Sequence, residues 1–299
     1  MAYARLARPA NIVTAMADIL CGFAASGLVL PLLTHPVFNF QILDPTPLLW
    51  LLLATVGLYG GGVVFNDVFD IELDRVERPE RPIPSGLASL KGAIILGMFL
   101  LFVGISAAYM VSLTSGTIAL AVASLAILYD WKGKHHSFLG PVNMGACRGG
   151  NLLLGISAVP HMIQERWSLA LIPIVFIAAI TMISRGEVHG GSKRMLLGAV
   201  FLYAFVIGAV FFLSLASAFY IWHALPFLLL FSLLIFPPLF KAVAKPEGKL
   251  IMGAVKAGVI SLIALDAAIA AGFAGWFYGL MVLLLLPVSL FLAKTFSVS

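Results

Sequence analysis

The chain has 299 residues, of which 62% are hydrophobic and only 10% charged, with a net charge of +5 and a mean hydropathy of +1.08. A soluble domain carries about 25% charged residues, so this composition excludes a soluble enzyme and predicts a polytopic membrane protein. No linker or low-complexity stretch divides the chain, so we expect one integral-membrane domain over 1–299.

Apolar segments of nearly membrane-spanning length follow one another along the whole chain. Each is close to the ~20 residues that a spanning helix needs. They lie at about 11–33, 47–67, 91–112, 114–130, 141–160, 168–186, 195–217, 221–241, 250–272 and 275–295. The sequence therefore predicts an all-α fold, a bundle of membrane helices.

Basic residues gather at one set of turns between these segments. They occur at the N-terminus and in the loops 68–90, 131–140, 187–194 and 242–249, whereas the opposite turns hold only Arg166. By the positive-inside rule, the N-terminus and these loops are expected to be cytoplasmic. A basic face suits anionic lipid headgroups as well as an anionic substrate, so it does not by itself indicate catalysis.

The most informative stretch comes directly after the second apolar segment. On a helix, Asp67, Asp70 and Asp74 are spaced i, i+3 and i+7 and form one stripe, with Asn66 beside it and Glu72 turned away. Three acids on one face repel each other unless a cation lies between them. Mg²⁺ prefers such oxygen ligands and commonly bridges carboxylates to phosphate oxygens, so the stripe predicts a magnesium site.

Arginines follow the acid stripe in a proline-rich loop. Arg75, Arg78 and Arg81 lie in or beside the stretch 78–86, whose prolines cannot continue a helix. A guanidinium binds phosphate oxygens in a bidentate fork, so metal and arginine together suit a diphosphate. The alternative is a set of ion pairs at the membrane surface.

These motifs resemble those of the UbiA superfamily of intramembrane prenyltransferases. The resemblance rests on Asn66 to Asp74, on Arg-Pro-Ile-Pro-Ser-Gly at 81–86, and on Arg-Pro-Ala-Asn at 8–11. It implies nine core helices around a central cavity, with the last apolar segment as an extra C-terminal helix. It also implies that the acid motifs bind Mg²⁺ and a prenyl diphosphate, and that Asn11 contacts this substrate.

The second acid motif of that family departs from its usual Asp-x-x-x-Asp pattern here. Glu187 replaces the first acid, Gly191 stands one helical turn later at the second, and His189 lies between them. We expect Glu187 to supply one metal ligand and the second site to be under-coordinated. The stretch 187–191 also resembles the UbiA-like proteins of bacterial ebo gene clusters, which implies the bacterial inner membrane.

Other polar side chains lie near the ends of apolar segments. Lys132 follows Tyr129 and Asp130, where the resemblance implies a lysine facing the diphosphate; the alternative is a lysine that snorkels to the interface.

Four more polar residues lie deeper in the predicted helices. Arg148 and Asn151 are spaced i, i+3, and an arginine at that depth needs a partner: a diphosphate, or Asp18 or Asp130. Asp18 either orients an acceptor or stabilises a cation, or it pairs with Arg148. Asp266 is equally compatible with function and with a buried hydrogen bond.

The sequence as a whole indicates Mg²⁺-dependent transfer of a prenyl group from a prenyl diphosphate to a small or lipophilic acceptor within the membrane. The expected partners are the prenyl diphosphate, membrane lipid and an acceptor that the sequence does not identify; no nucleic acid is expected. The alternatives are a non-catalytic polyprenyl-lipid-binding protein, a transport-related protein, and an enzyme that transfers a sugar phosphate to polyprenyl phosphate.

Overall fold

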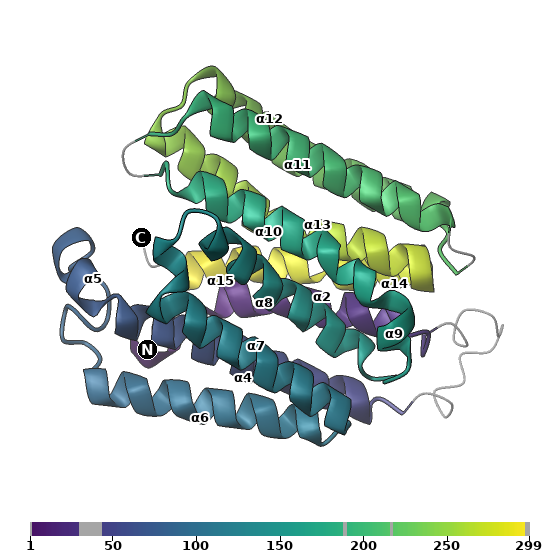
Figure 1. Cartoon of the computed structure of the whole chain (residues 1–299), viewed down its shortest axis with the longest axis horizontal. Helices are drawn as coiled ribbons and strands as arrows, with labels where there is room; N and C mark the ends of the chain where they lie inside the picture. Colours follow the sequence, from purple (N-terminus) through teal and green to yellow (C-terminus); the bar gives the residue numbers. More distant parts are fainter. Residues whose placement is uncertain (1, 30–43, 188–189, 216–217, 297–299) are drawn as a thin grey trace.

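The computed structural model of this protein describes residues 2–29, 44–187, 190–215 and 218–296. Every regular element in these residues is helical (Figure 1). The α-helices are α1 (Ala2–Leu6), α2 (Pro9–Ala25), α4 (Thr46–Phe69), α5 (Ile71–Glu77), α6 (Leu90–Tyr109), α7 (Leu113–Trp131), α8 (Leu139–Ile156), α9 (Met162–Arg166), α10 (Leu171–Ser184), α11 (Lys193–Phe212), α12 (Ile221–Ala244), α13 (Gly248–Ala274), α14 (Trp276–Leu283) and α15 (Leu285–Thr295). Short 3₁₀ turns occupy Gly133–His135, Trp167–Ala170 and Leu213–Leu215.

The prediction of a membrane helical bundle is confirmed. Within the described ranges, eight helical stretches are long and apolar enough to cross a membrane, and α2 is a shorter apolar helix. The segment expected at 141–160 forms α8, and the one expected at 275–295 forms α14 and α15. The count of nine core helices stays a prediction.

Glycines allow two of these helices to pack closely. A Cβ on Gly57 of α4 would lie 2.7 Å from the Cα of Gly104 on α6, and 2.5 Å from a backbone oxygen of α6. Without a hydrophobic driving force between helices in lipid, small residues at such crossings let the backbones gain van der Waals contact.

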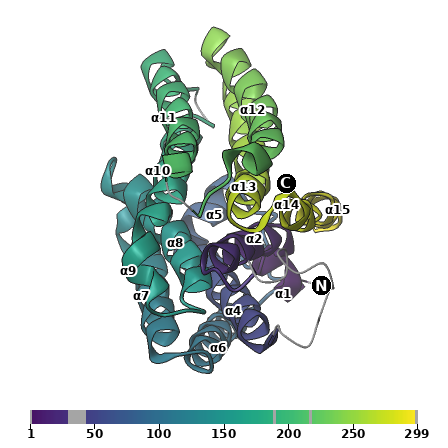
Figure 2. The same ribbon diagram turned by 90° about the vertical axis from the view of Figure 1, so that its right-hand side faces the viewer.

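The most buried helix is α13, in which every residue from Ser261 to Ala274 is buried. It packs against α2, α10, α12 and α14. Figure 2 shows α11 and α12 on one side of the bundle and α4, α6 and α7 on the other. A helix buried on all faces belongs at the centre of such a bundle, so α13 and α2 form its middle.

Both termini and α5 lie at the same end of the bundle (Figure 1). The loops that follow α5 and α7 lie there as well, and they carry the arginines and lysines singled out above. The fold therefore brings together the charged segments that the sequence spreads over residues 5–134.

Candidate functional site

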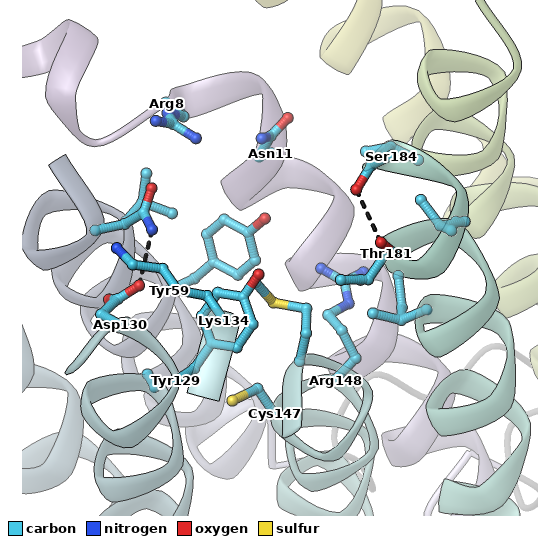
Figure 3. Close-up of a pocket in the computed structure, with 18 of the residues that line it drawn as sticks. Arg8, Asn11, Tyr59, Tyr129, Asp130, Lys134, Cys147, Arg148, Thr181 and Ser184 are labelled. Atoms are coloured by element: carbon cyan, nitrogen blue, oxygen red, sulfur yellow. Dashed lines mark hydrogen bonds between the residues drawn. The ribbon is translucent and has the colours of Figure 1, made fainter. Parts of the chain in front are cut away.

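A cavity of about 530 Å³ opens at this end of the bundle and runs inward between the helices. Its charged and amide lining residues are Arg8, Asn11, Asn66, Asp70, Asp74, Glu77, Arg78, Arg81, Asp130, Lys134, Arg148 and Asn151. Its apolar lining residues are Leu58, Val63, Leu73, Val122, Ala126, Met144, Ile177, Ile180, Val255, Val259 and Leu262. Figure 3 shows side chains from several helices converging on this space. The cavity thus combines charged and apolar walls.

The acid stripe does not lie on one uninterrupted helix. Helix α4 ends at Phe69, Asp70 has φ −89° and ψ 3°, and α5 begins at Ile71. Asp67 and Asp74 are both buried, and the Nη1 atom of Arg81 contacts them at 3.3 and 2.6 Å. The proline-rich loop therefore folds back and places Arg81 between the first and last acids of the stripe.

Arg8 completes this group from the N-terminal side. Its Nη2 atom lies 2.6 Å from Oδ1 of Asp67. Its backbone has φ 47°, the only positive φ of a non-glycine residue among those the structure describes. A left-handed conformation is unfavourable for such a residue. Here it occurs directly before α2, where the Arg8 side chain contacts Asp67 of α4.

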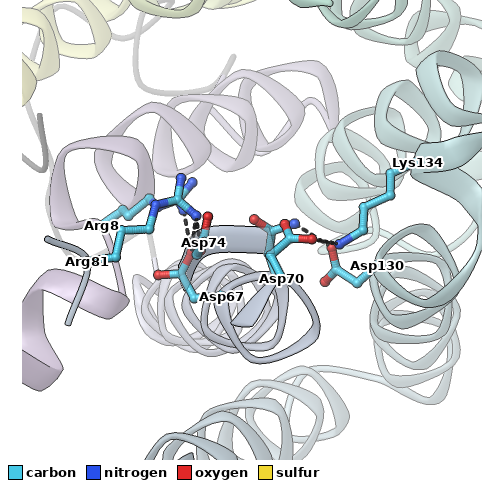
Figure 4. A network of polar contacts seen from close by, with 8 residues as sticks. Arg8, Asp67, Asp70, Asp74, Arg81, Asp130 and Lys134 are labelled. Carbon is cyan, nitrogen blue, oxygen red and sulfur yellow. Dashed lines mark hydrogen bonds and ion pairs between the residues drawn. The ribbon is translucent and has the colours of Figure 1, made fainter. Parts of the chain in front are cut away.

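The middle acid of the stripe faces a different group. Asp70 pairs with Lys134, and the Nδ2 atom of Asn66 donates a hydrogen bond of 2.8 Å to Oδ1 of Asp130. Figure 4 shows Asp67 and Asp74 with the arginines on one side, and Asp70 and Asp130 with Lys134 on the other. In this structure Asp67 and Asp74 face the arginines and Asp70 faces Lys134, and the expected convergence of the three acids on one ion stays a prediction. Across the described residues, no three Asp, Glu, His or Cys side chains are grouped closely enough to hold a metal.

Two neighbouring details of the sequence prediction have opposite outcomes. Glu72 is exposed and pairs with Arg75 at 2.7 Å, so its expected position away from the stripe is confirmed. Lys132 is exposed, with its ammonium 4.4 Å from the centre of the Trp131 ring, and does not line the cavity. Lys134, in the 3₁₀ turn after α7, lines the cavity instead.

Arg148 and Asn151 lie deeper and are held by α2. Arg148 contacts Asp18 through Nη2 at 3.0 Å and Nε at 2.9 Å, and Nη2 donates to the backbone oxygen of Thr14 at 2.9 Å. Asn151 donates to Asp18 at 2.9 Å. Of the partners considered for Arg148, the structure thus supplies Asp18, which is fully buried and does not line the cavity. Asp266 is also buried, and its Oδ2 atom has no hydrogen-bond partner in the described chain.

Glu187 and Gly191 of the degenerate second motif lie outside the cavity lining. Helix α10 ends at Ser184, so Gly191 is not one helical turn beyond Glu187, and that expectation is wrong. Glu187 is half-buried; burial raises the pKa of its carboxyl, and the charges of Arg78 and Lys256 oppose this rise. His189 lies outside the described residues.

The side chains of α10 that do reach the cavity are uncharged. Thr181 and Ser184 line it, and the hydroxyl of Ser184 donates to the backbone oxygen of Thr181 at 2.9 Å (Figure 3). The polar groups that α10 brings to the cavity are therefore two hydroxyl groups.

The donor set at the cavity fits a hard divalent cation. Asn66, Asp70 and Asp74 line the cavity and offer carboxylate and amide oxygens. The two acids already hold positive groups, the ammonium of Lys134 and the guanidinium of Arg81. This end of the cavity is therefore built to stabilise cations, although its acids face in two directions.

Sequence reasoning underestimated two residues of this group. The sequence indicated Asp130 only as a partner for Arg148, and Lys134 is one of the basic residues of the 131–140 loop. The feature of the sequence that could have identified them is their position beside Tyr129 and Lys132, within the same six residues at the end of a predicted helix.

A helical bundle in the described residues, apolar over most of its length and with a charged cavity at one end, defines an integral membrane protein. Residues 28–248 match the UbiA prenyltransferase family, and the chain belongs to this family.

Curated relatives agree with this assignment. The chain is 30% identical over 225 residues to digeranylgeranylglyceryl phosphate synthase of Methanoculleus marisnigri, covering 70% of this chain and 74% of the relative. It is 36% identical over 143 residues to the synthase of the same name from Methanococcoides burtonii, covering 45% of this chain and 50% of that relative. The chain thus spans about half the length of the latter.

Solved structures share the fold. A UbiA homolog from Archaeoglobus fulgidus bound to DMAPP and Mg²⁺ superposes with a TM-score of 0.68 at 15% identity, covering 94% of this chain and 99% of that one. A structure of digeranylgeranylglyceryl phosphate synthase gives a TM-score of 0.66 at 23% identity, covering 91% and 98%.

Proposed function

We propose that this protein transfers a prenyl group from a prenyl diphosphate to an acceptor within the membrane, in a Mg²⁺-dependent reaction and as a single membrane domain. The observation that carries the proposal is the cavity itself, in which carboxylates, arginines and a lysine share a wall with an apolar lining. A prenyl diphosphate has the same two halves, a polyanionic head and a hydrocarbon tail. The Archaeoglobus homolog bound to DMAPP and Mg²⁺ supports the same ligand class.

The charged residues divide between two tasks. Asn66, Asp70 and Asp74 would hold Mg²⁺, which supplies positive charge to the diphosphate when bound. Arg81 and Lys134 would contact the diphosphate oxygens and neutralise the charge that develops as the carbon–oxygen bond breaks. Both cations lie against the acids in this structure, so they are within reach of a ligand held there.

Asp67 supports the arginines of this site without lining the cavity. It is buried, does not line the cavity, and accepts hydrogen bonds from Arg8 and Arg81. We assign it to holding the two arginines in place, with Asn11 contacting the substrate from the first turn of α2.

The inner part of the cavity suits the prenyl chain and the reacting carbon. Tyr59 and Tyr129 line it together with apolar side chains of α7, α10 and α13. Aromatic faces attract a cationic carbon, and an apolar wall excludes the water that would otherwise capture it. Arg148 and Asn151 border this region but are already held by Asp18, so we assign them to shaping its wall.

The acceptor is expected to be a lipid-soluble alcohol, and a prenylated glyceryl phosphate is the class that the curated relatives' names support. The positive-inside pattern supports a cytoplasmic position of the cavity opening. Placement in a bacterial inner membrane and in the ebo branch rests on the sequence stretch 187–191 and stays a prediction.

The test uses the full chain in nanodiscs with ¹⁴C-labelled geranylgeranyl diphosphate, Mg²⁺ and a geranylgeranylglyceryl phosphate acceptor. We expect a labelled lipid product and equimolar diphosphate release, both lost with EDTA and in Asp70→Asn. Tight, saturable binding of the diphosphate without release would favour the second candidate, a non-catalytic polyprenyl-lipid-binding protein. The position of Glu187 outside the cavity lining supports that candidate.

A further inference from the structure

Asn66 makes one side-chain hydrogen bond in the described part of the chain, and Asp130 is its partner. Nδ2 of Asn66 donates to Oδ1 of Asp130 at 2.8 Å. The two residues are 64 positions apart, on α4 and α7, so the contact exists only through the packing of these helices. Both residues line the cavity.

The chemistry of the pair determines which end of the Asn66 amide faces Asp130. An amide group has a donor end and an acceptor end, whereas an ionised carboxylate only accepts. Asp130 therefore attracts the NH₂ group and turns the carbonyl oxygen of Asn66 toward the remainder of the cavity wall. Only that oxygen can coordinate a cation, because the amide nitrogen carries its hydrogens and has no free lone pair.

Asp130 is suited to this role by its own surroundings. It is 4% exposed, at the end of α7, and the positive charge of Lys134 lies beside it (Figure 4). Burial restricts its side chain, which keeps its contact with the Asn66 amide in place.

We propose that Asp130 is a positioning residue that orients the Asn66 amide so that its carbonyl oxygen faces the Mg²⁺–diphosphate site. The proposal rests on the proposed function, since it requires Asn66 to be a cation ligand. It gives a role to a carboxylate outside both acid motifs. Groups that orient metal ligands in this way typically change metal affinity about 10- to 100-fold when they are removed.

Asp130→Asn is the informative variant because it keeps the size of the side chain and removes its preference for the NH₂ group of Asn66. The amide introduced by this substitution can meet Asn66 with either its oxygen or its NH₂. The Asn66 amide is then no longer held with its carbonyl oxygen toward the cavity. A carboxylate at position 66 needs no orientation, because it presents an oxygen on either side.

The experiment is a Mn²⁺ titration followed by electron paramagnetic resonance, on the full chain in detergent, with thermal unfolding as the folding control. We expect Asp130→Asn to weaken Mn²⁺ binding about 10- to 100-fold. Asp130→Glu, which still only accepts, is expected to stay within about threefold of the wild type. In an Asn66→Asp background, adding Asp130→Asn is expected to leave binding unchanged or to tighten it.

Three results would overturn the proposal. One is wild-type affinity in folded Asp130→Asn; another is an equal loss in both backgrounds, which would mean that Asp130 acts on the cation through its own charge. The third is a loss in Asp130→Glu as large as in Asp130→Asn. Asp70→Ala distinguishes a failure of this proposal from a failure of the proposed function. Undiminished Mn²⁺ binding in that variant would mean that the cation does not bind at this site.

Discussion

The buried pair of Arg148 and Asp18 gives the sharpest stability prediction. Arg148 and Asp18 are both buried, and two contacts of 3.0 and 2.9 Å join them. Replacing Arg148 by Met keeps an unbranched apolar stem but removes the guanidinium, and so leaves the Asp18 carboxylate without its cation. Asn151 still donates one hydrogen bond to that carboxylate at 2.9 Å, which is not enough to neutralise it.

Removing one partner of a buried pair costs about 3–5 kcal/mol, because the remaining charge is uncompensated. We expect Arg148→Met to be destabilised by about this amount. Asp18→Asn added to it replaces the charge by a neutral group of the same shape, so the double variant should recover most of the loss. If adding Asp18→Asn raises the stability of Arg148→Met, the loss came from the broken ion pair. If the loss came only from packing, the second substitution would not restore stability.

The assay is equilibrium unfolding in mixed micelles, followed by tryptophan fluorescence, for the wild type, both single variants and the double variant. A double variant no more stable than Arg148→Met would refute the reasoning. The same proteins test whether Arg148 binds substrate. The refolded double variant should keep prenyl-diphosphate affinity within about fivefold, whereas a loss near the 1.5–3 kcal/mol of a charged hydrogen bond would make Arg148 a direct ligand.

Three further predictions concern the mouth of the cavity. Lys134→Ala should weaken prenyl-diphosphate binding about tenfold or more, because a charge-assisted hydrogen bond contributes about 1.5–3 kcal/mol, while the matched Lys132→Ala should change it less than twofold by calorimetry. Glu187→Gln should keep both turnover and the Mg²⁺ midpoint within about twofold, whereas Asp70→Asn should lose most turnover. A strong loss of turnover in Glu187→Gln would mean that Glu187 belongs to the metal site. Single cysteines engineered in the 68–90 loop should react with impermeant maleimide only from the cytoplasmic side, and labelling from outside would contradict the proposed topology.

Much of this protein could be predicted from local features of its sequence. The scarcity of charge determines that the chain resides in a membrane, because each span must be apolar over about 20 residues. Prolines at 79, 82 and 84 end the helical pattern and form the loop that holds Arg81. These properties depend on residue type and short-range spacing, which are fully visible in the sequence.

The facing directions of the charged side chains were decided by tertiary structure. A uniform helix would place Asp67, Asp70 and Asp74 in one stripe, but the interruption at Asp70 and the return of Arg81 divide them.

Lys132 and Lys134 show the same limit over two residues. Both follow the same helix, and only the 3₁₀ turn decides that Lys134 reaches the cavity while Lys132 lies on Trp131. The partners that hold these groups, such as Arg8 for Asp67 and Asp18 for Arg148, are 59 and 130 residues away. The free energy of a buried charge depends on which opposite charge is packed against it, and that follows only from the assembled bundle.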